Sequence, residues 1–206
     1  MRVIDHLVYC VPDLHQAMKI FSEKCGVEVV YGGQHLSIGT HNALLNIGNG
    51  AYLEFLAIDP SNTNIQGSRW MGMDLIDQPT FTRWAIKTNN LEQDTTILKK
   101  VNAEMGNIFA GSRKKADGST LNWAMALPLA LPEVEILPFM IDWKDSIHPT
   151  ATLATGCQLL TLGATHPTPE LVQPTLNALG TNLKVKKDSK AKLYARIQTP
   201  MGILEI

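Results

Sequence analysis

The residue that most needs a chemical explanation is Glu54. It lies in the segment 51–58, Ala-Tyr-Leu-Glu-Phe-Leu-Ala-Ile, whose other residues are apolar or aromatic. A carboxylate in a buried strand costs free energy unless a metal, a cation, a hydrogen-bond network or water in a cleft compensates it. The alternative is an outer-face Glu paired with a Lys or Arg. We expect Glu54 to face a cleft, where a carboxylate can move a proton or bind a metal.

A second candidate, His6, lies in the apolar segment 3–11. Strand alternation places it on one face with Val8 and Cys10, and Leu7 and Tyr9 on the other. In a cleft, its imidazole can serve as a metal ligand or as a general base. The alternative is a histidine at the edge of the core, hydrogen-bonded to a neighbour.

Four further residues are candidates for binding a substrate. His41 and Asn42 form a short polar break before an apolar strand, where they can bind a substrate or satisfy local backbone groups. Arg113 follows Gly111-Ser112 and is close in sequence to Trp123, which suggests an anion-binding guanidinium beside an aromatic wall. The alternative for Arg113 is a surface position on a hairpin.

The elements that must position these residues follow one order three times. Residues 1–59 predict strand, helix and three strands, with Asp13 capping the helix and Gly26 ending it. The same order is predicted for 80–143 and, in shorter form, for 157–206, with a connector at 60–79 and a linker at 144–156. Within the first unit, five strand segments are predicted, at 3–11, 27–31, 35–38, 42–47 and 51–58, one more than this order contains. A repeat of this length is stronger evidence for the fold than any single predicted element.

The bulk composition narrows the classes of function. The chain has 206 residues, 45% of them hydrophobic, and a net charge of −1, as expected of a globular protein with a sizeable core. No basic stripe suggests nucleic acid, and no apolar run reaches the roughly 20 residues that span a bilayer. The start of the chain enters a strand pattern directly, so we expect a cytoplasmic protein with no membrane partner.

Several short motifs resemble the vicinal oxygen chelate superfamily, which includes glyoxalase I, extradiol dioxygenases and bleomycin resistance proteins. Residues 4–8 (IDHLV) with 11–14 (VPDL) look like the first strand and helix start of that superfamily. Four further segments resemble a narrower group, the glyoxalase-like domain proteins. They are residues 39–44 (GTHNAL), 52–54 (YLE), 137–143 (LPFMIDW) and 165–167 (THP).

The resemblance implies an α+β fold in which repeated β-α-β-β-β units form a curved, partly open mixed sheet around a cleft, with helices outside. It also implies metal ligands on the first and last strands of each unit. His6 and Glu54 hold those places in the first unit, and Gln158 and Glu205 in the third. The middle unit departs, because Arg83 stands about where His6 stands in the first.

The function implied is a metal-dependent lyase or isomerase that acts on a small oxygen-chelating substrate. A divalent transition metal (Zn, Ni, Fe or Mn) would act as the Lewis acid, unless no metal is bound. The alternative is a metal-free protein that sequesters a small molecule between walls such as Trp84, Trp123, Trp143 and Phe139. A homodimer is also implied, because superfamily members often pair their units between chains.

Overall fold

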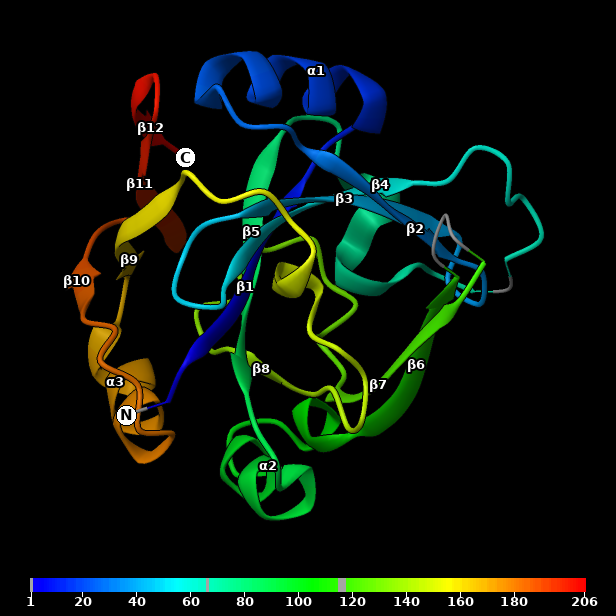
Figure 1. The fold of residues 1–206 in the computed structure, drawn as a ribbon. Helices are drawn as coiled ribbons and strands as arrows, with labels where there is room; N and C mark the ends of the chain where they lie inside the picture. Colours follow the sequence, from blue (N-terminus) through cyan, green and yellow to red (C-terminus); the bar gives the residue numbers. More distant parts are fainter. Residues whose placement is uncertain (1, 66, 115–117) are drawn as a thin grey trace.

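The computed structural model describes residues 2–65, 67–114 and 118–206, and its centre is a barrel of eight strands (Figure 1). The first four are β1 (Ile4–Cys10), β2 (Val30–His35), β3 (Thr40–Asn46) and β4 (Tyr52–Ile58). The other four are β5 (Thr80–Lys87), β6 (Ile108–Lys114), β7 (Thr120–Ala126) and β8 (Phe139–Asp142). Around the barrel the order is β1-β4-β3-β2-β6-β7-β8-β5, so the first two predicted units share it.

The predicted mixed sheet is confirmed, and it is almost closed. β1 pairs parallel with β4 and antiparallel with β5, and β5 pairs parallel with β8. The weakest seam joins β2 to β6, where only the pair Gln34 and Lys114 is in register among the described residues. The barrel is therefore nearly closed, with its least extensive pairing beside Arg113.

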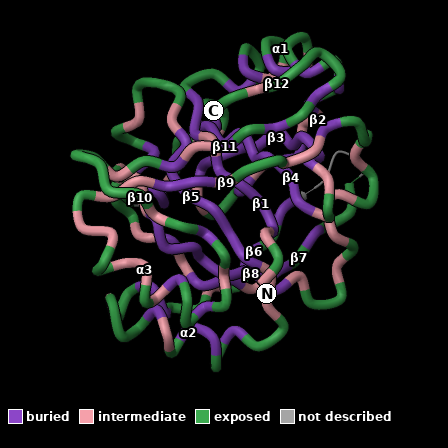
Figure 2. Tube along the Cα trace, turned by 90° about the vertical axis from the view of Figure 1, so that its left-hand side faces the viewer, coloured by how far each residue is buried: buried purple, intermediate pink, exposed green. Residues whose placement is uncertain are grey.

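The remaining strands form a second sheet with the order β10-β9-β11-β12. They are β9 (Gln158–His166), β10 (Val185–Lys187), β11 (Lys192–Thr199) and β12 (Gly202–Glu205). The Leu159 amide donates to the Ile47 carbonyl over 2.7 Å, which ties this sheet to the hairpin between β3 and β4. Its buried side chains, such as Ala164, Leu193 and Ile197, belong to the same core as residues of the barrel. Figure 2 shows buried stretches (purple) in both the barrel strands and this sheet.

Among the described residues, three α-helices lie outside the barrel: α1 (Leu14–Cys25), α2 (Leu91–Lys99) and α3 (Pro169–Ala178) (Figure 1). The Asp13 side chain accepts from the Gln16 amide, which confirms the predicted cap. Gly26 ends α1 in the left-handed conformation at φ 67°. Short 3-10 helices lie at Trp70–Leu75, Ala103–Gly106 and Pro149–Ala151. No helix in the described ranges is long and apolar enough to cross a membrane.

Strand alternation divides the apolar residues into two cores. Leu7 and Val11 belong to the core between the barrel, α1 and the second sheet, whereas Val8 and Cys10 belong to the core inside the barrel. Because successive side chains point to opposite faces, His6 and Glu54 lie on the barrel's inner face. The strands' alternation therefore carries the polar candidates inward.

One strand differs from the prediction. The sequence predicts strands at 27–31 and 35–38, but the structure has one strand, β2, that ends at His35. The Ile38 and Gly39 amides both donate to the His35 carbonyl, and Gly39 takes φ 72°. A tight turn thus replaces the second predicted strand and places His35 opposite Thr40.

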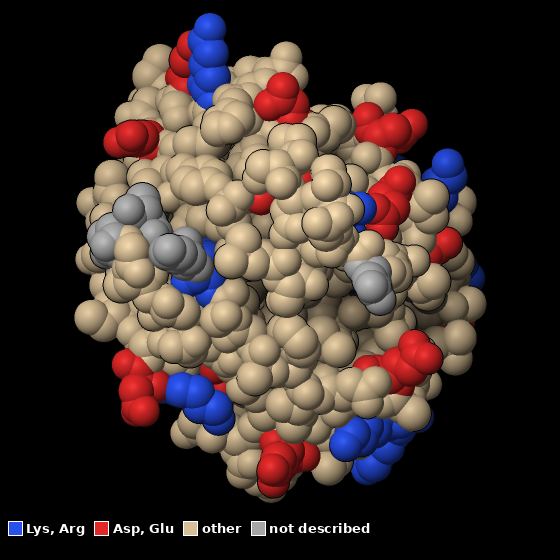
Figure 3. All heavy atoms as spheres, turned by 90° about the vertical axis from the view of Figure 1, so that its right-hand side faces the viewer, with Lys and Arg blue, Asp and Glu red and all other residues tan. Residues whose placement is uncertain are grey.

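Charged side chains do not gather by sign on the outer face shown in Figure 3. Acidic and basic groups are interspersed there around a largely uncharged middle. The distinctive charges of this protein are inside the barrel.

Candidate functional site

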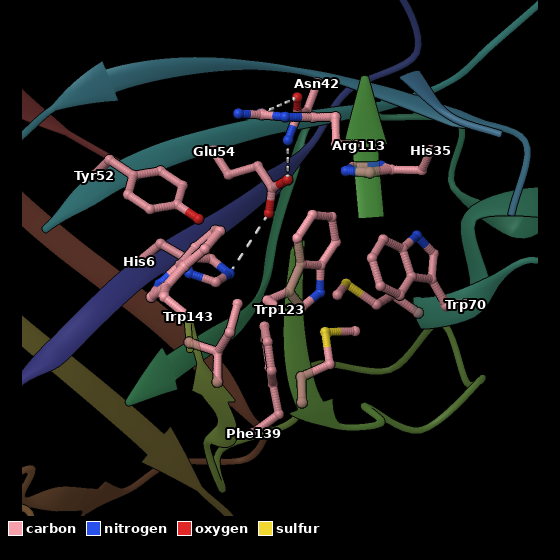
Figure 4. Close-up of a pocket in the computed structure, with 13 residues that line it drawn as sticks. His6, His35, Asn42, Tyr52, Glu54, Trp70, Arg113, Trp123, Phe139 and Trp143 are labelled. Atoms are coloured by element: carbon pink, nitrogen blue, oxygen red, sulfur yellow. Dashed lines mark hydrogen bonds and ion pairs between the residues drawn. The ribbon is translucent and has the colours of Figure 1, made fainter. Parts of the chain in front are cut away.

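The barrel encloses a pocket with about 360 Å³ of space, including its open mouth. Its polar side chains come from five strands: His6 from β1, His35 from β2, Asn42 from β3, Tyr52 and Glu54 from β4, and Arg113 from β6. Its apolar wall includes Trp70, Trp123, Phe139 and Trp143 (Figure 4). The pocket therefore combines a few charged groups with an aromatic surround, as small-molecule sites do.

Glu54 is buried at 6% exposure and is fixed by a neighbour. The Asn42 side-chain amide donates to Glu54 Oε1 over 2.6 Å. The other face of the same Asn42 side chain accepts a hydrogen bond, 2.8 Å long, from Arg113 Nη1. Asn42 thus stands between the carboxylate and the guanidinium and holds both (Figure 4).

This arrangement depends on the absence of a side chain at Gly32. A Cβ there would lie 2.3 Å from both Arg113 Nη1 and Asn42 Oδ1. Gly32 lies on β2 beside the seam with β6, so the guanidinium crosses close to backbone. Only glycine leaves this space, which explains the residue type at that position.

His6 is held by its neighbour Asp5. Asp5 Oδ1 lies 2.6 Å from His6 Nδ1, and Asp5 Oδ2 accepts from Trp143 Nε1 over 2.9 Å and lies 3.1 Å from His148 Nε2. Burial alone would raise the pKa of Asp5, but the hydrogen bonds from His148 and His6 outweigh it and hold the pKa well below its ordinary value. An ionised Asp5 can only accept, so His6 Nδ1 carries a proton.

That hydrogen bond fixes which nitrogen of His6 faces the pocket. His6 Nε2 points to Glu54 Oε2 at 3.6 Å, a separation longer than a hydrogen bond. The ring is stacked on Tyr52 with centroids 4.8 Å apart and meets the Phe139 ring edge-on at 5.2 Å. The pocket thus presents an oriented imidazole nitrogen and a carboxylate oxygen side by side.

A register shift in β1 allows the adjacent side chains of Asp5 and His6 to contact each other. Neighbouring residues in a regular strand point to opposite faces, yet Asp5 and His6 contact each other. The pairing of β1 with β5 shifts register between Ile4 and His6. Such an irregularity re-aims a side chain, and it accounts for the Asp5–His6 contact.

Away from His6, the pocket is lined by the guanidinium of Arg113, the ring of His35 and two indole groups. Arg113 is 6% exposed, and burial lowers the pKa of its guanidinium. His35 Nδ1 lies 3.0 Å from the Thr40 hydroxyl, and its ring contacts Trp70 and Trp123. Burial, with the nearby charge of Arg113, lowers the pKa of His35 to about 3, so this ring is neutral near pH 7.

The structure brings together five of the predicted site residues and leaves three apart. His6, Asn42, Glu54, Arg113 and Trp123 all line the pocket. Of the three that lie elsewhere, His41 faces the outside of β3, where its ring contacts His15 and Tyr31, and Gln158 and Glu205 belong to the second sheet. Glu205 is exposed and accepts from Arg196 Nε over 3.0 Å.

Sequence reasoning assigned no role to Asp5 or His35. The signal for Asp5 was the Asp-His pair, which alternation places on opposite faces. His35 was predicted to begin a strand, and only the observed turn reveals that it ends one beside Thr40. Tyr52, two residues before Glu54 in β4, also lines the pocket, as alternation along a strand requires.

The donors present do not fit the transition-metal site that the resemblance implies. His6 and Glu54 supply one nitrogen and one carboxylate from the first unit, but β8 of the second unit faces the pocket with Phe139 and Ile141. In the described parts of the chain no three His, Cys, Asp or Glu residues cluster as a metal site would need. Three or four protein ligands are usual for such metals, so we derive no step through one.

Residues 4–180 match the family model described as a glyoxalase-like domain. The chain belongs to the glyoxalase-like domain family. This confirms the resemblance to the vicinal oxygen chelate superfamily, and the matched range covers the whole barrel. No curated protein matches the sequence.

Solved structures are similar to this chain at low sequence identity, and the first of them shares its fold. A hypothetical protein from Staphylococcus aureus is 13% identical, with a TM-score of 0.68, over 93% of this chain and 88% of that one. A methylmalonyl-CoA epimerase from Mycobacterium tuberculosis is 17% identical, with a TM-score of 0.41, over 68% of this chain and 86% of that one. A variant of the Streptomyces coelicolor epimerase, in complex with 2-nitronate-propionyl-CoA, is 14% identical, with a TM-score of 0.45, over 71% of this chain and 97% of that one.

Proposed function

We propose that this glyoxalase-like protein is an acid–base enzyme, an isomerase or lyase that moves a proton on a small oxygen-bearing substrate in the barrel. The observation that supports this most is the 3.6 Å separation of His6 Nε2 and Glu54 Oε2 in a pocket walled by aromatic rings. Asp5 orients the imidazole, and Asn42 orients the carboxylate. Preorganised pairs of this kind are what general acid–base catalysis requires.

The two groups stand on the same side of any molecule that fills the pocket. A substrate atom near one of them is within reach of the other, because they are only 3.6 Å apart. The geometry therefore suits an isomerisation, in which a proton leaves one carbon and is returned to an adjacent atom. It also suits an elimination, in which a proton is removed while a neighbouring group leaves. It suits less well a racemisation that needs acid and base on opposite faces.

The buried guanidinium of Arg113 favours negative charge that develops in the pocket. Removing a proton beside a carbonyl produces an enolate, whose charge rests on oxygen. Arg113 lies across Asn42 from Glu54, so the cation and the base are held in one network. The metal-dependent version of this activity would need donors beyond His6 and Glu54.

A test that needs no prior substrate is proton exchange in deuterated water. Small carbonyl compounds and acids are incubated with the protein, and deuterium at carbon is followed by nuclear magnetic resonance. We expect Glu54→Gln to slow exchange by about 10²- to 10⁴-fold, the usual contribution of a positioned acid–base group. Glu205→Gln is the matched control, since that exposed residue lies in the second sheet, and it should exchange at the wild-type rate.

Two results would refute the proposal. Equal exchange by wild type and Glu54→Gln would remove Glu54 from the chemistry. Loss of exchange after exhaustive chelation, with recovery on adding a divalent metal, would restore the metal-dependent mechanism.

The alternative function is a metal-free protein that binds and sequesters a small molecule. The aromatic walls favour it, because Trp123, Trp143 and Phe139 can cover an apolar ligand without any chemistry. Tight binding of such a ligand with no proton exchange on any compound tested would support this function over catalysis.

A further inference from the structure

Buried N–H donors without a protein acceptor concentrate in the pocket. Within the described ranges four buried side-chain donors have no hydrogen-bond partner, and they belong to Trp70, Arg83, Arg113 and Trp123. Three of these four residues line the pocket, the exception being Arg83. Folded proteins pair nearly all of their buried donors, so three unpaired donors around one cavity point to a ligand that accepts.

The pocket offers few acceptors of its own for these donors. Oε1 of Glu54 already accepts from Asn42, and Oε2 faces His6. Trp123 lies between the polar group around Glu54 and the ring of Trp70 (Figure 4). A molecule that fills the space beside Trp123 must therefore bring acceptor atoms with it.

Arg113 adds a charge to this arrangement. Its side chain is buried, and no carboxylate of the described chain lies within ion-pair distance of it. Asn42 occupies the position between Arg113 and Glu54 and bonds to both, so it keeps the guanidinium from closing on the carboxylate. The Nε–H of the guanidinium has no hydrogen-bond partner in the described ranges. A buried guanidinium with an unpaired N–H favours an anion as its ligand.

We propose that the pocket selects small organic acids, whose carboxylate accepts hydrogen bonds from Arg113 and Trp123. The rest of the acid then lies against Phe139 and Trp143, with its α-carbon near His6 and Glu54. A monoanion suits the charges better than a phosphate, because one guanidinium stands beside the carboxylate of Glu54 and a dianion would be repelled. The placement of the α-carbon rests on the proposed function; the selection of a carboxylate does not.

The experiment compares acids with their neutral amides. Calorimetry and tryptophan fluorescence measure the binding of two acid–amide pairs, phenylacetate with phenylacetamide and propionate with propionamide. Binding of phenylphosphonate is measured in the same way. The variants are Arg113→Met, which removes the charge, Arg113→Lys, which keeps it, and Trp123→Phe, which keeps the wall and removes the N–H. Arg196→Met is the control, because that arginine is exposed in the second sheet.

We expect wild type and Arg196→Met to bind each acid at least about tenfold more tightly than its amide, the usual value of a hydrogen bond to a charged group. The preference should disappear in Arg113→Met, persist in part in Arg113→Lys and fall several-fold in Trp123→Phe. Glu54→Gln should bind the acids more tightly, since it removes a negative charge. If Arg113→Met does not fold, Trp123→Phe and Glu54→Gln still decide the matter.

The proposal is overturned if amides bind wild type as tightly as acids, if phenylphosphonate binds more tightly than phenylacetate, or if no acid binds at millimolar concentration. It is also overturned if the preference survives in Arg113→Met. The two proposals fail separately. Acids that bind without any proton exchange would contradict only the enzymatic function, whereas exchange on neutral carbonyl compounds with no preference for acids would contradict only the choice of ligand.

Discussion

The neutral, buried His35 makes a sharp prediction about the effect of acid on the stability of the fold. Its pKa is lowered from 6.5 to about 3, first by burial and then by the charge of Arg113. Between these two values the unfolded chain binds a proton on this imidazole and the folded chain does not. Protonation therefore favours unfolding, and the stability due to this group falls as pH drops below about 6.5 and levels off near 3.

The size of the effect follows from the two pKa values. Between pH 7 and pH 5, His35 should remove about 2 kcal/mol from the free energy of unfolding. The substitution His35→Asn removes the titrating ring and keeps a polar atom near the Thr40 hydroxyl. It should lower stability at pH 7 by about 1–2 kcal/mol through lost contact with Trp70 and Trp123.

The assay is urea unfolding at pH 7, 6 and 5, followed by tryptophan fluorescence. The measured quantity is the loss of unfolding free energy from pH 7 to pH 5, which should be about 2 kcal/mol smaller in His35→Asn than in wild type. Subtraction cancels the other groups that titrate in this range. His15→Asn is the control, because it is the same substitution at an exposed histidine on α1.

Equal slopes for wild type and His35→Asn would refute the reasoning. They would mean that the ring is protonated in the folded state without cost, and hence that it is solvated or paired. A slope that changes in His15→Asn instead would place the sensitive imidazole on the surface.

Two further substitutions test buried charges. Asp5→Asn leaves donors of His6, His148 and Trp143 facing a weaker acceptor, and should cost about 3 kcal/mol at pH 7. Because the hydrogen bonds hold the folded-state pKa of Asp5 well below 3.8, its contribution is complete above about pH 4 and is lost progressively as pH falls further. The gap between wild type and variant should therefore be narrower at pH 3 than at pH 7, as measured by unfolding at both. Arg83→Met should cost about 3 kcal/mol or more in thermal or urea unfolding, because the guanidinium donates to four backbone carbonyls; a neutral result would show that solvent replaces it.

The linear sequence was sufficient for the fold class and for two of the residues that lie inside the barrel, His6 and Glu54. Period-two alternation decides which face each strand residue takes, so His6 and Glu54 were predictable as inward-facing. The buried carboxylate of Glu54 was also a sufficient signal that something compensates it. Local rules equally predicted the helix that runs from the Asp13 cap to Gly26.

The tertiary structure decided which side chains from distant strands come into contact. Arg113 and Asn42 are 71 positions apart, and they touch only because β2 and β6 close the barrel and Gly32 leaves room between them. Strand order likewise separates Glu205 from Glu54, although both lie in the last strands of their predicted units. A strand's own residues determine its inward face, but its neighbours across the barrel depend on pairings between distant segments, which no local pattern encodes.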